Sequence, residues 1–119
     1  MEVVNVRVAK IRPKYKDLRE WMRDEKNEYI GRKGVVFIEG ERYPKEESKW
    51  ANPYKLKEGY TREEAIKEYE RYIREKIERE GLEEELMKLE GKKLGCWCKP
   101  EACHGDVLVK IIKEMKAKR

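Results

Sequence analysis

The sequence predicts a small α/β domain, in which a layered sheet with flanking helices ends in a strand, a cysteine loop and a helix. Valines alternate near the amino terminus, residues 61–81 carry the period of an amphipathic helix, and an apolar strand precedes a last helix. Strands that alternate with helices are typical of layered α/β domains. A chain of 119 residues fits one domain, which we expect to span residues 1–119.

The first forty residues hold short elements. The alternating segment Val3–Val8 predicts a strand. A short helix should follow, with one side formed by Leu18, Trp21 and Met22. The β-prone residues 28–40 are interrupted by glycines, and they predict either one broken strand or a hairpin.

Residues 41–60 contain two prolines and little periodicity, so they predict a long loop. A loop of this length inside a small domain is uncommon unless it carries function. Its centre makes Ser48, Lys49, Trp50 and Asn52 candidates for substrate binding. The alternative is a loop that is held in place only because Trp50 is buried in the core.

The second half predicts three helices. Thr61 and Glu64 form a capping-box pattern at the start of the first, and Gly81 ends it. A short helix over residues 82–90 follows, then the strand of residues 92–98, and then a last helix. The expected inward positions of the first and last helices are Ala65, Ile66, Tyr69, Tyr72, Ile73, Ile77, Val107, Leu108, Ile111, Ile112 and Met115.

Charge and hydropathy narrow the classes of function. The 30 Lys and Arg residues exceed the 25 Asp and Glu residues, which gives a net charge of +5. This balance permits binding of phosphate or nucleic acid without requiring it. A surface rich in Lys and Glu is typical of proteins from very hot environments. With no apolar run of eighteen residues and no signal-peptide pattern, we expect a cytoplasmic protein without a membrane span.

The segment KLGCWCKPEACHGDVL, residues 93–108, holds all three cysteines and the single histidine of the chain. Cys96 and Cys98 are two apart on a predicted strand, so their side chains should point to one face and Trp97 to the other. Cys103 should stand where the last helix begins, with His104 beside it. Packing alone explains one small buried cysteine easily, but it explains this concentration poorly.

Metal binding is the first interpretation of the cluster. Cys96, Cys98, Cys103 and His104 would form a closed zinc site; their identities suit zinc better than their spacing does. In an open site, three thiolates would bind zinc or an iron–sulfur cluster and leave one position for substrate. His104, Glu101 or Asp106 would then lie around the metal or carry protons.

Thiol chemistry without a metal is the second interpretation. Cys103 would be the nucleophile, because the start of a helix lowers the pKa of a thiol. His104 would act as its base, and Cys96 or Cys98 would resolve an oxidised Cys103.

Four blocks carry a resemblance to a known family: YIGR at residues 29–32, SKWANPY at 48–54, TREEAIKEYERYI at 61–73, and LEGKKLGCWCKPEACHGDVL at 89–108. Together they resemble a small prokaryotic and viral family catalogued as domain of unknown function number four-three-two-six. The resemblance covers about residues 4–113 and leaves a basic tail. It implies a small standalone protein of the kind that handles nucleotides or modifies nucleic acid, and it assigns no reaction.

Polar residues of these blocks complete the hypothesis. Arg32, Lys49, Asn52 and Arg62 could converge on the cysteine loop and hold a phosphate or the edge of a base. The leading prediction is a zinc enzyme that acts on a nucleotide or nucleic-acid base by hydrolysis or group transfer, with Asp106 or Glu101 moving protons. The alternatives are a zinc-stapled nucleic-acid-binding module without catalysis, and a thiol or iron–sulfur enzyme. Nothing in the sequence indicates an oligomeric state.

Overall fold

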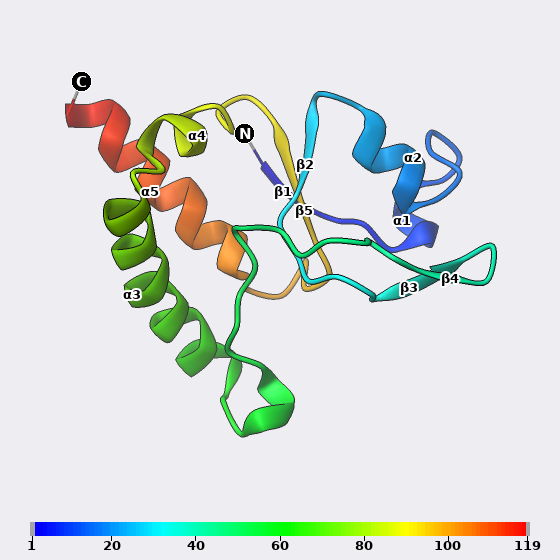
Figure 1. The fold of residues 1–119 in the computed structure, drawn as a ribbon, viewed down its shortest axis with the longest axis horizontal. Helices are drawn as coiled ribbons and strands as arrows, with labels where there is room; N and C mark the ends of the chain where they lie inside the picture. The colour runs from blue at the N-terminus through cyan, green and yellow to red at the C-terminus, as the bar shows by residue number, and fades with distance from the viewer. Residues whose placement is uncertain (1, 119) are drawn as a thin grey trace.

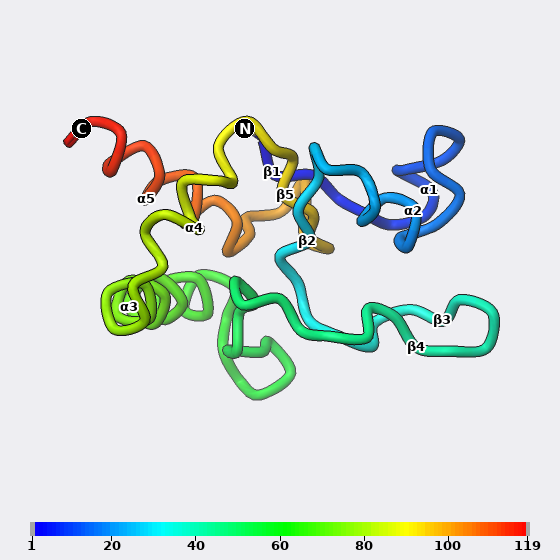
Figure 2. The backbone as a smooth tube through the Cα atoms, turned by 45° about the horizontal axis from the view of Figure 1, so that its top comes forward, coloured from blue at the N-terminus to red at the C-terminus, as the bar shows by residue number. Residues whose placement is uncertain are grey.

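A three-stranded parallel sheet lies at the centre of the computed structural model, which describes residues 2–118. Strand β5 (Lys93–Cys96) lies between β1 (Glu2–Asn5) and β2 (Asn27–Tyr29). A separate antiparallel pair, β3 (Val36–Ile38) and β4 (Glu41–Tyr43), forms a hairpin that extends away from the sheet (Figures 1 and 2).

Helices cover both faces of the parallel sheet, so the domain has three layers (Figure 1). Helices α1 (Val8–Ile11) and α2 (Leu18–Arg23) lie on one face. The opposite face is covered by α3 (Arg62–Glu80), α4 (Glu83–Met87) and α5 (His104–Lys118). This arrangement confirms the predicted α/β class.

Strand β5 contributes to both hydrophobic cores because its side chains alternate between the two faces. Leu94 and Cys96 are buried against α3 and α5, whereas Trp97, directly after the strand, packs on the side of α1 and α2. Gly95 also faces that side, where a Cβ atom would lie 2.4 Å from Cη2 of Trp21. The indole of Trp21 therefore lies directly on the backbone of the central strand.

Helix α3 has the predicted capping box and inward stripe. Thr61 Oγ1 accepts a hydrogen bond from the Glu64 amide at 3.1 Å, and Glu64 Oε1 accepts one from the Thr61 amide at 2.9 Å. Gly81 ends the helix in the left-handed region, with φ of 64°. The fully buried residues of the stripe are Ala65, Tyr69, Ile73 and Ile77, and Ile66 and Tyr72 are partly buried.

The prediction of a strand through Val8 was wrong at its end. Strand β1 stops at Asn5, and α1 begins at Val8. The Asn5 side chain accepts a hydrogen bond from the Arg7 amide at 2.9 Å, which turns the chain out of the sheet. The valine alternation continues past this turn, so periodicity alone could not locate it. In α2, Leu18 and Trp21 are buried as predicted, but Met22 is 40% exposed.

Residues 28–40 are neither one broken strand nor a self-contained hairpin. Strand β2 belongs to the parallel sheet, and β3 pairs with β4, which lies inside the predicted loop. Glu39 and Gly40 connect β3 to β4 with positive φ values of 52° and 80°. Two residues with positive φ between paired strands match the twist of a tight hairpin.

Close packing on β5 gives a stability prediction. We expect Gly95→Ala to lower the free energy of unfolding by about 1–3 kcal/mol, since the added methyl group must displace Trp21 or Val6. Lys93→Ala, at an exposed position of the same strand, is the matched control and should change stability by less than about 0.5 kcal/mol. Urea unfolding followed by circular dichroism measures both variants, and equal effects would contradict the packing argument.

Candidate functional site

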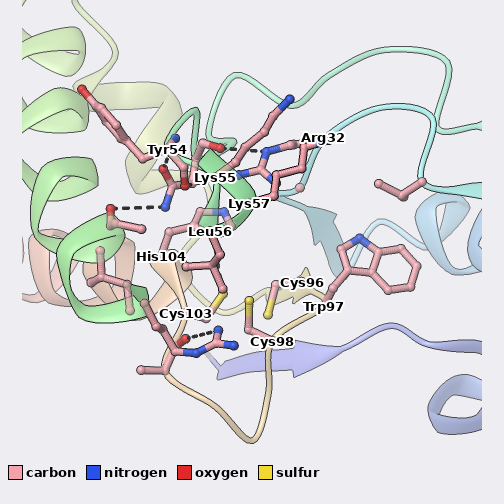
Figure 3. Close-up of a pocket in the computed structure, with 17 residues that line it drawn as sticks. Arg32, Tyr54, Lys55, Leu56, Lys57, Cys96, Trp97, Cys98, Cys103 and His104 are labelled. Atoms are coloured by element: carbon pink, nitrogen blue, oxygen red, sulfur yellow. Dashed lines mark hydrogen bonds between the residues drawn. The ribbon is translucent and has the colours of Figure 1, made fainter. Parts of the chain in front are cut away.

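A cavity of about 310 Å³ lies at the carboxyl edge of the parallel sheet (Figure 3). Residues directly after β2 and β5 line it, together with the first turns of α3 and α5. Because all three strands are parallel, their carboxyl ends meet at this edge, which is where open α/β sheets usually bind ligands.

Three cysteines form one wall of this cavity. Cys96 is the last residue of β5, Cys98 lies two residues beyond it, and Cys103 directly precedes α5. In Figure 3 their sulfur atoms lie close together. The predicted convergence of the three cysteines is therefore present. Strand β5 ends earlier than predicted, at Cys96, but the side chains of Cys96 and Cys98 still face the same core.

Cys103 also caps the last helix. Its Sγ accepts a hydrogen bond from the Gly105 amide at 3.5 Å, and its own amide donates to Asp106 Oδ2 at 3.0 Å. These bonds satisfy polar groups at the start of α5 that have no partner within the helix. Asp106 also forms an ion pair with Lys99 at 2.7 Å, which closes the turn between β5 and α5.

Hydrogen bonding by the Cys103 thiol shifts the pKa values of the three thiols in different directions. The pKa of Cys98 is lowered to about 6, mainly by the Cys103 thiol and in part by the Arg62 guanidinium beside the Cys98 sulfur. The pKa of Cys96 is lowered to about 7, again mainly by the bond from Cys103. The pKa of Cys103 itself is raised, because its proton is shared with these two acceptors. Negative charge in the cluster therefore concentrates on Cys98 and Cys96.

His104 is buried and held by the end of β2. Its Nε2 lies 2.7 Å from the carbonyl oxygen of Ile30, and a carbonyl can only accept, so Nε2 carries the hydrogen. Nδ1 then presents its lone pair to Cys103 Sγ at 3.6 Å. Burial lowers the pKa of His104 to about 4, so the ring is neutral at pH 7. This geometry positions the Cys103 thiol.

Four cationic residues line the cavity, and no carboxylate is among its lining residues. Arg62 lies at the start of α3 and donates to the carbonyl oxygen of Ala102 at 3.3 Å. Lys55 and Lys57 come from the short 3₁₀ turn η1 (Leu56–Glu58) and the residue before it. Arg32 follows β2. The electrostatic character of the cavity favours an anionic ligand.

Arg32 and Asn52 line the cavity, and their hydrogen bonds hold its loop in place. Arg32 Nε donates to the Asn52 carbonyl oxygen at 2.9 Å, and Asn52 Oδ1 accepts from the Tyr54 amide at 2.8 Å. Asn52 Nδ2 also reaches the Ala65 carbonyl oxygen of α3 at 3.4 Å. These contacts fix the wall opposite the sulfurs (Figure 3).

Other predicted site residues lie outside the cavity lining. Trp50 is 2% exposed and its carbonyl oxygen accepts from Tyr69, so it belongs to the core. Ser48 Oγ accepts from the Trp50 amide at 3.1 Å, and Lys49 pairs with Glu85. Glu101 is exposed on the turn before α5, and Asp106 is occupied by the helix cap and Lys99.

Sequence reasoning missed Lys55 and Lys57. They flank Leu56 in the sequence YKLKEG, and the two lysines on either side of an apolar residue were the available signal. Their place in the lining depends on the fold of the segment around η1, which no periodicity indicates.

A metal ion was the leading prediction for this cluster. Within residues 2–118, no group of three or more His, Cys, Asp or Glu side chains has an arrangement ready to hold one. The Cys103 thiol has a single proton, for which Cys96 Sγ, Cys98 Sγ and His104 Nδ1 compete. Zinc and iron–sulfur binding stay predictions.

Comparison with known proteins places the chain in a family. The model of the family "Domain of unknown function (DUF4326)" matches residues 14–114, and the chain belongs to this family. An uncharacterised 12.4 kDa protein in the nrdA-td intergenic region of Enterobacteria phage T4 is 37% identical over 67 residues. That match covers 56% of this chain and 61% of the phage protein, so the chain spans about three fifths of its relative. No solved structure matches the chain significantly.

The predicted absence of a membrane span agrees with the described helices. None within residues 2–118 combines the length and the apolar character that crossing a bilayer requires.

The buried neutral His104 gives a pH prediction. Its folded pKa of about 4 lies below the ordinary value of 6.5, so between these pH values the unfolded chain binds a proton that the folded chain does not. Stability should therefore fall as the pH falls from 7 to 4, with His104 contributing about 3 kcal/mol of that loss.

His104→Gln keeps a donor for the Ile30 carbonyl oxygen and removes the titration. Urea unfolding of the wild type and of His104→Gln at pH 7 and pH 4 gives the stability that each protein loses on acidification. The difference between the two losses is the contribution of His104. Equal pH dependence in the two proteins would show that His104 is not held neutral.

Proposed function

We propose that this member of DUF4326 is a small thiol-dependent enzyme that transfers or hydrolyses a group on a nucleotide or nucleic-acid component. One observation carries the proposal: three neighbouring sulfurs form the wall of a cavity that four cations and no carboxylate line. The cations would bind a phosphate of the substrate, and a thiolate would attack the atom beside it.

Cys98 is the reacting thiol in this proposal, in place of Cys103. Its pKa of about 6 leaves it ionised at pH 7, and it is less buried than the two cysteines beside it. Attack by Cys98 Sγ forms a covalent bond to the substrate, and the displaced group leaves with the bonding electron pair. Water or an acceptor then releases the bound group and restores the thiolate.

Cys103 and Arg62 position and stabilise this thiolate. The Cys103 proton stabilises the thiolate when it points toward Cys98 Sγ, and His104 Nδ1 is the competing acceptor for the same proton. Arg62 lies between the sulfur of Cys98 and the Ala102 carbonyl oxygen, so it can contact both the thiolate and a bound anion. We assign no proton transfer to Glu101 or Asp106, since neither lines the cavity.

The reactivity of Cys98 tests the proposal. Alkylation by iodoacetamide, followed by peptide mass spectrometry, should modify Cys98 first and reach half of its maximal rate near pH 6. Arg62→Ala should move that midpoint upward, because it removes a cation that favours the thiolate. Lys67→Ala, at an exposed position of the same helix, is the matched control.

An anion should protect Cys98 in the same assay. Inorganic phosphate or a nucleoside monophosphate should slow alkylation of the wild type, and Arg62→Ala and Lys57→Ala should lose this protection. Alkylation with a midpoint near pH 9 that neither anions nor Arg62→Ala change would exclude Cys98 as the reacting thiol.

Zinc is the second candidate, and the geometry of His104 favours it. Histidine ligands usually donate their other ring nitrogen to a carbonyl, as Nε2 does here to Ile30. The 3.6 Å from Nδ1 to Cys103 Sγ also equals the distance of about 3.6 Å between sulfur and nitrogen ligands in a tetrahedral zinc site. Zinc held this way would polarise a substrate or staple the loop of a nucleic-acid-binding module.

Elemental analysis of anaerobically purified protein separates the two candidates. The thiol proposal predicts zinc and iron far below one equivalent in the wild type. One equivalent of zinc in the wild type that is lost in each of Cys96→Ser, Cys98→Ser and Cys103→Ser would replace the thiol enzyme with a zinc site.

A further inference from the structure

A second cavity, of about 420 Å³, lies on the other face of the sheet between α1 and the β3–β4 hairpin. Arg12 and Lys16 line one side of it, and Phe37 lines the hairpin side. Trp97 is among the residues that line both cavities, and its indole packs on the side of α1 and α2.

This second cavity is called the groove below. The chain segment on its amino-terminal side is strongly basic. Residues 7–16 hold five cations and no acidic residue, which equals the net charge of +5 of the whole chain. All five side chains are exposed, and among residues 2–118 none of them forms an ion pair. The five are Arg7, Lys10, Arg12, Lys14 and Lys16.

The carboxylates at the groove do not offset this charge. Asp17 and Glu39 are the acidic residues among those that line the cavity, and both pair with Arg19, at 3.7 Å and 3.4 Å. The cations of residues 7–16 therefore remain available to a polyanion.

The hairpin side supplies an aromatic surface. Phe37 is 66% exposed, and the Arg42 guanidinium lies over its ring, 4.6 Å from the centroid. An exposed aromatic ring is a surface on which unpaired bases stack, and a neighbouring arginine adds to such contacts. Val8 and Val36, which also line the groove, add apolar contact.

We infer that this groove binds single-stranded nucleic acid, with phosphates on residues 7–16 and a base on Phe37. A basic track beside an exposed aromatic ring fits a flexible polyanion with unstacked bases better than it fits a duplex, whose bases are hidden. Trp97 lines both cavities, so a strand bound in the groove would lie near the residue that separates it from the cysteine cavity. Binding does not depend on the proposed thiol chemistry; only delivery to the cysteines rests on it.

Fluorescence anisotropy of the full chain with labelled oligothymidylate and oligouridylate tests the inference. We expect saturable binding that weakens steeply with salt, and weaker binding of a duplex of equal length. Arg12→Ala/Lys16→Ala should reduce the slope of log affinity against log salt by about 1.4, which corresponds to two lost phosphate contacts. Phe37→Ala should weaken binding about tenfold while leaving the salt slope unchanged.

Lys88→Ala/Lys113→Ala is the matched control, since it removes two exposed cations on the other face, one directly after α4 and one in α5. Thermal unfolding checks that each variant is folded. If Arg12→Ala/Lys16→Ala does not fold, Lys10→Ala/Lys14→Ala takes its place. Three results would overturn the inference: no saturable binding at low salt, equal loss in the control pair, or a duplex or polyglutamate peptide that binds as tightly as the single strand.

A Cys98→Ser variant keeps this test separate from the proposed function. It should bind the oligonucleotides like the wild type. If both proteins bind the oligonucleotides and Cys98 of the wild type is unreactive in the alkylation assay, only the proposed thiol enzyme is refuted. If neither the wild type nor Cys98→Ser binds the oligonucleotides, only the proposal for the groove is refuted.

Discussion

The burial of strand β5 on both faces is the constraint on which the rest of the structure depends. Its neighbours β1 and β2 are parallel to it, so residues that leave all three strands reach the same edge. On one face, Leu94 and Cys96 pack against α3 and α5. On the other face, Gly95 has no side chain, so the indole of Trp21 packs directly on the strand. The direction of Cys96 and Trp97, and so the division between the two cavities, follows from this alternation.

The sequence was sufficient for the features that rest on local patterns. The capping box of Thr61, the stripe of α3 and the last helix depend on neighbours within a few residues, and the structure confirms them. The cysteine cluster could be found because 3 cysteines and the 1 histidine occupy one short segment. The family resemblance rested on the same segment and is confirmed, whereas an origin in a hot environment stays a prediction.

Features that rest on distant partners could not be predicted. Strand β4 forms only because the turn at Glu39 returns the chain onto β3, and Lys55 and Lys57 line the cavity only because their segment folds back toward the cysteine loop. The burial of His104 depends on a carbonyl oxygen 74 residues away in sequence. The same holds for Trp50, whose place in the core is set by Tyr69, and for Asp106, which the helix start and Lys99 occupy.

The sulfur of Cys103 belongs both to the cysteine cluster and to the start of α5, since it accepts from the Gly105 amide and its proton lies among the other sulfurs. An adduct on this atom would replace the acceptor of the Gly105 amide at the same time as it altered the cluster. Chemical modification of the cluster and the geometry of the helix start are therefore linked through one atom.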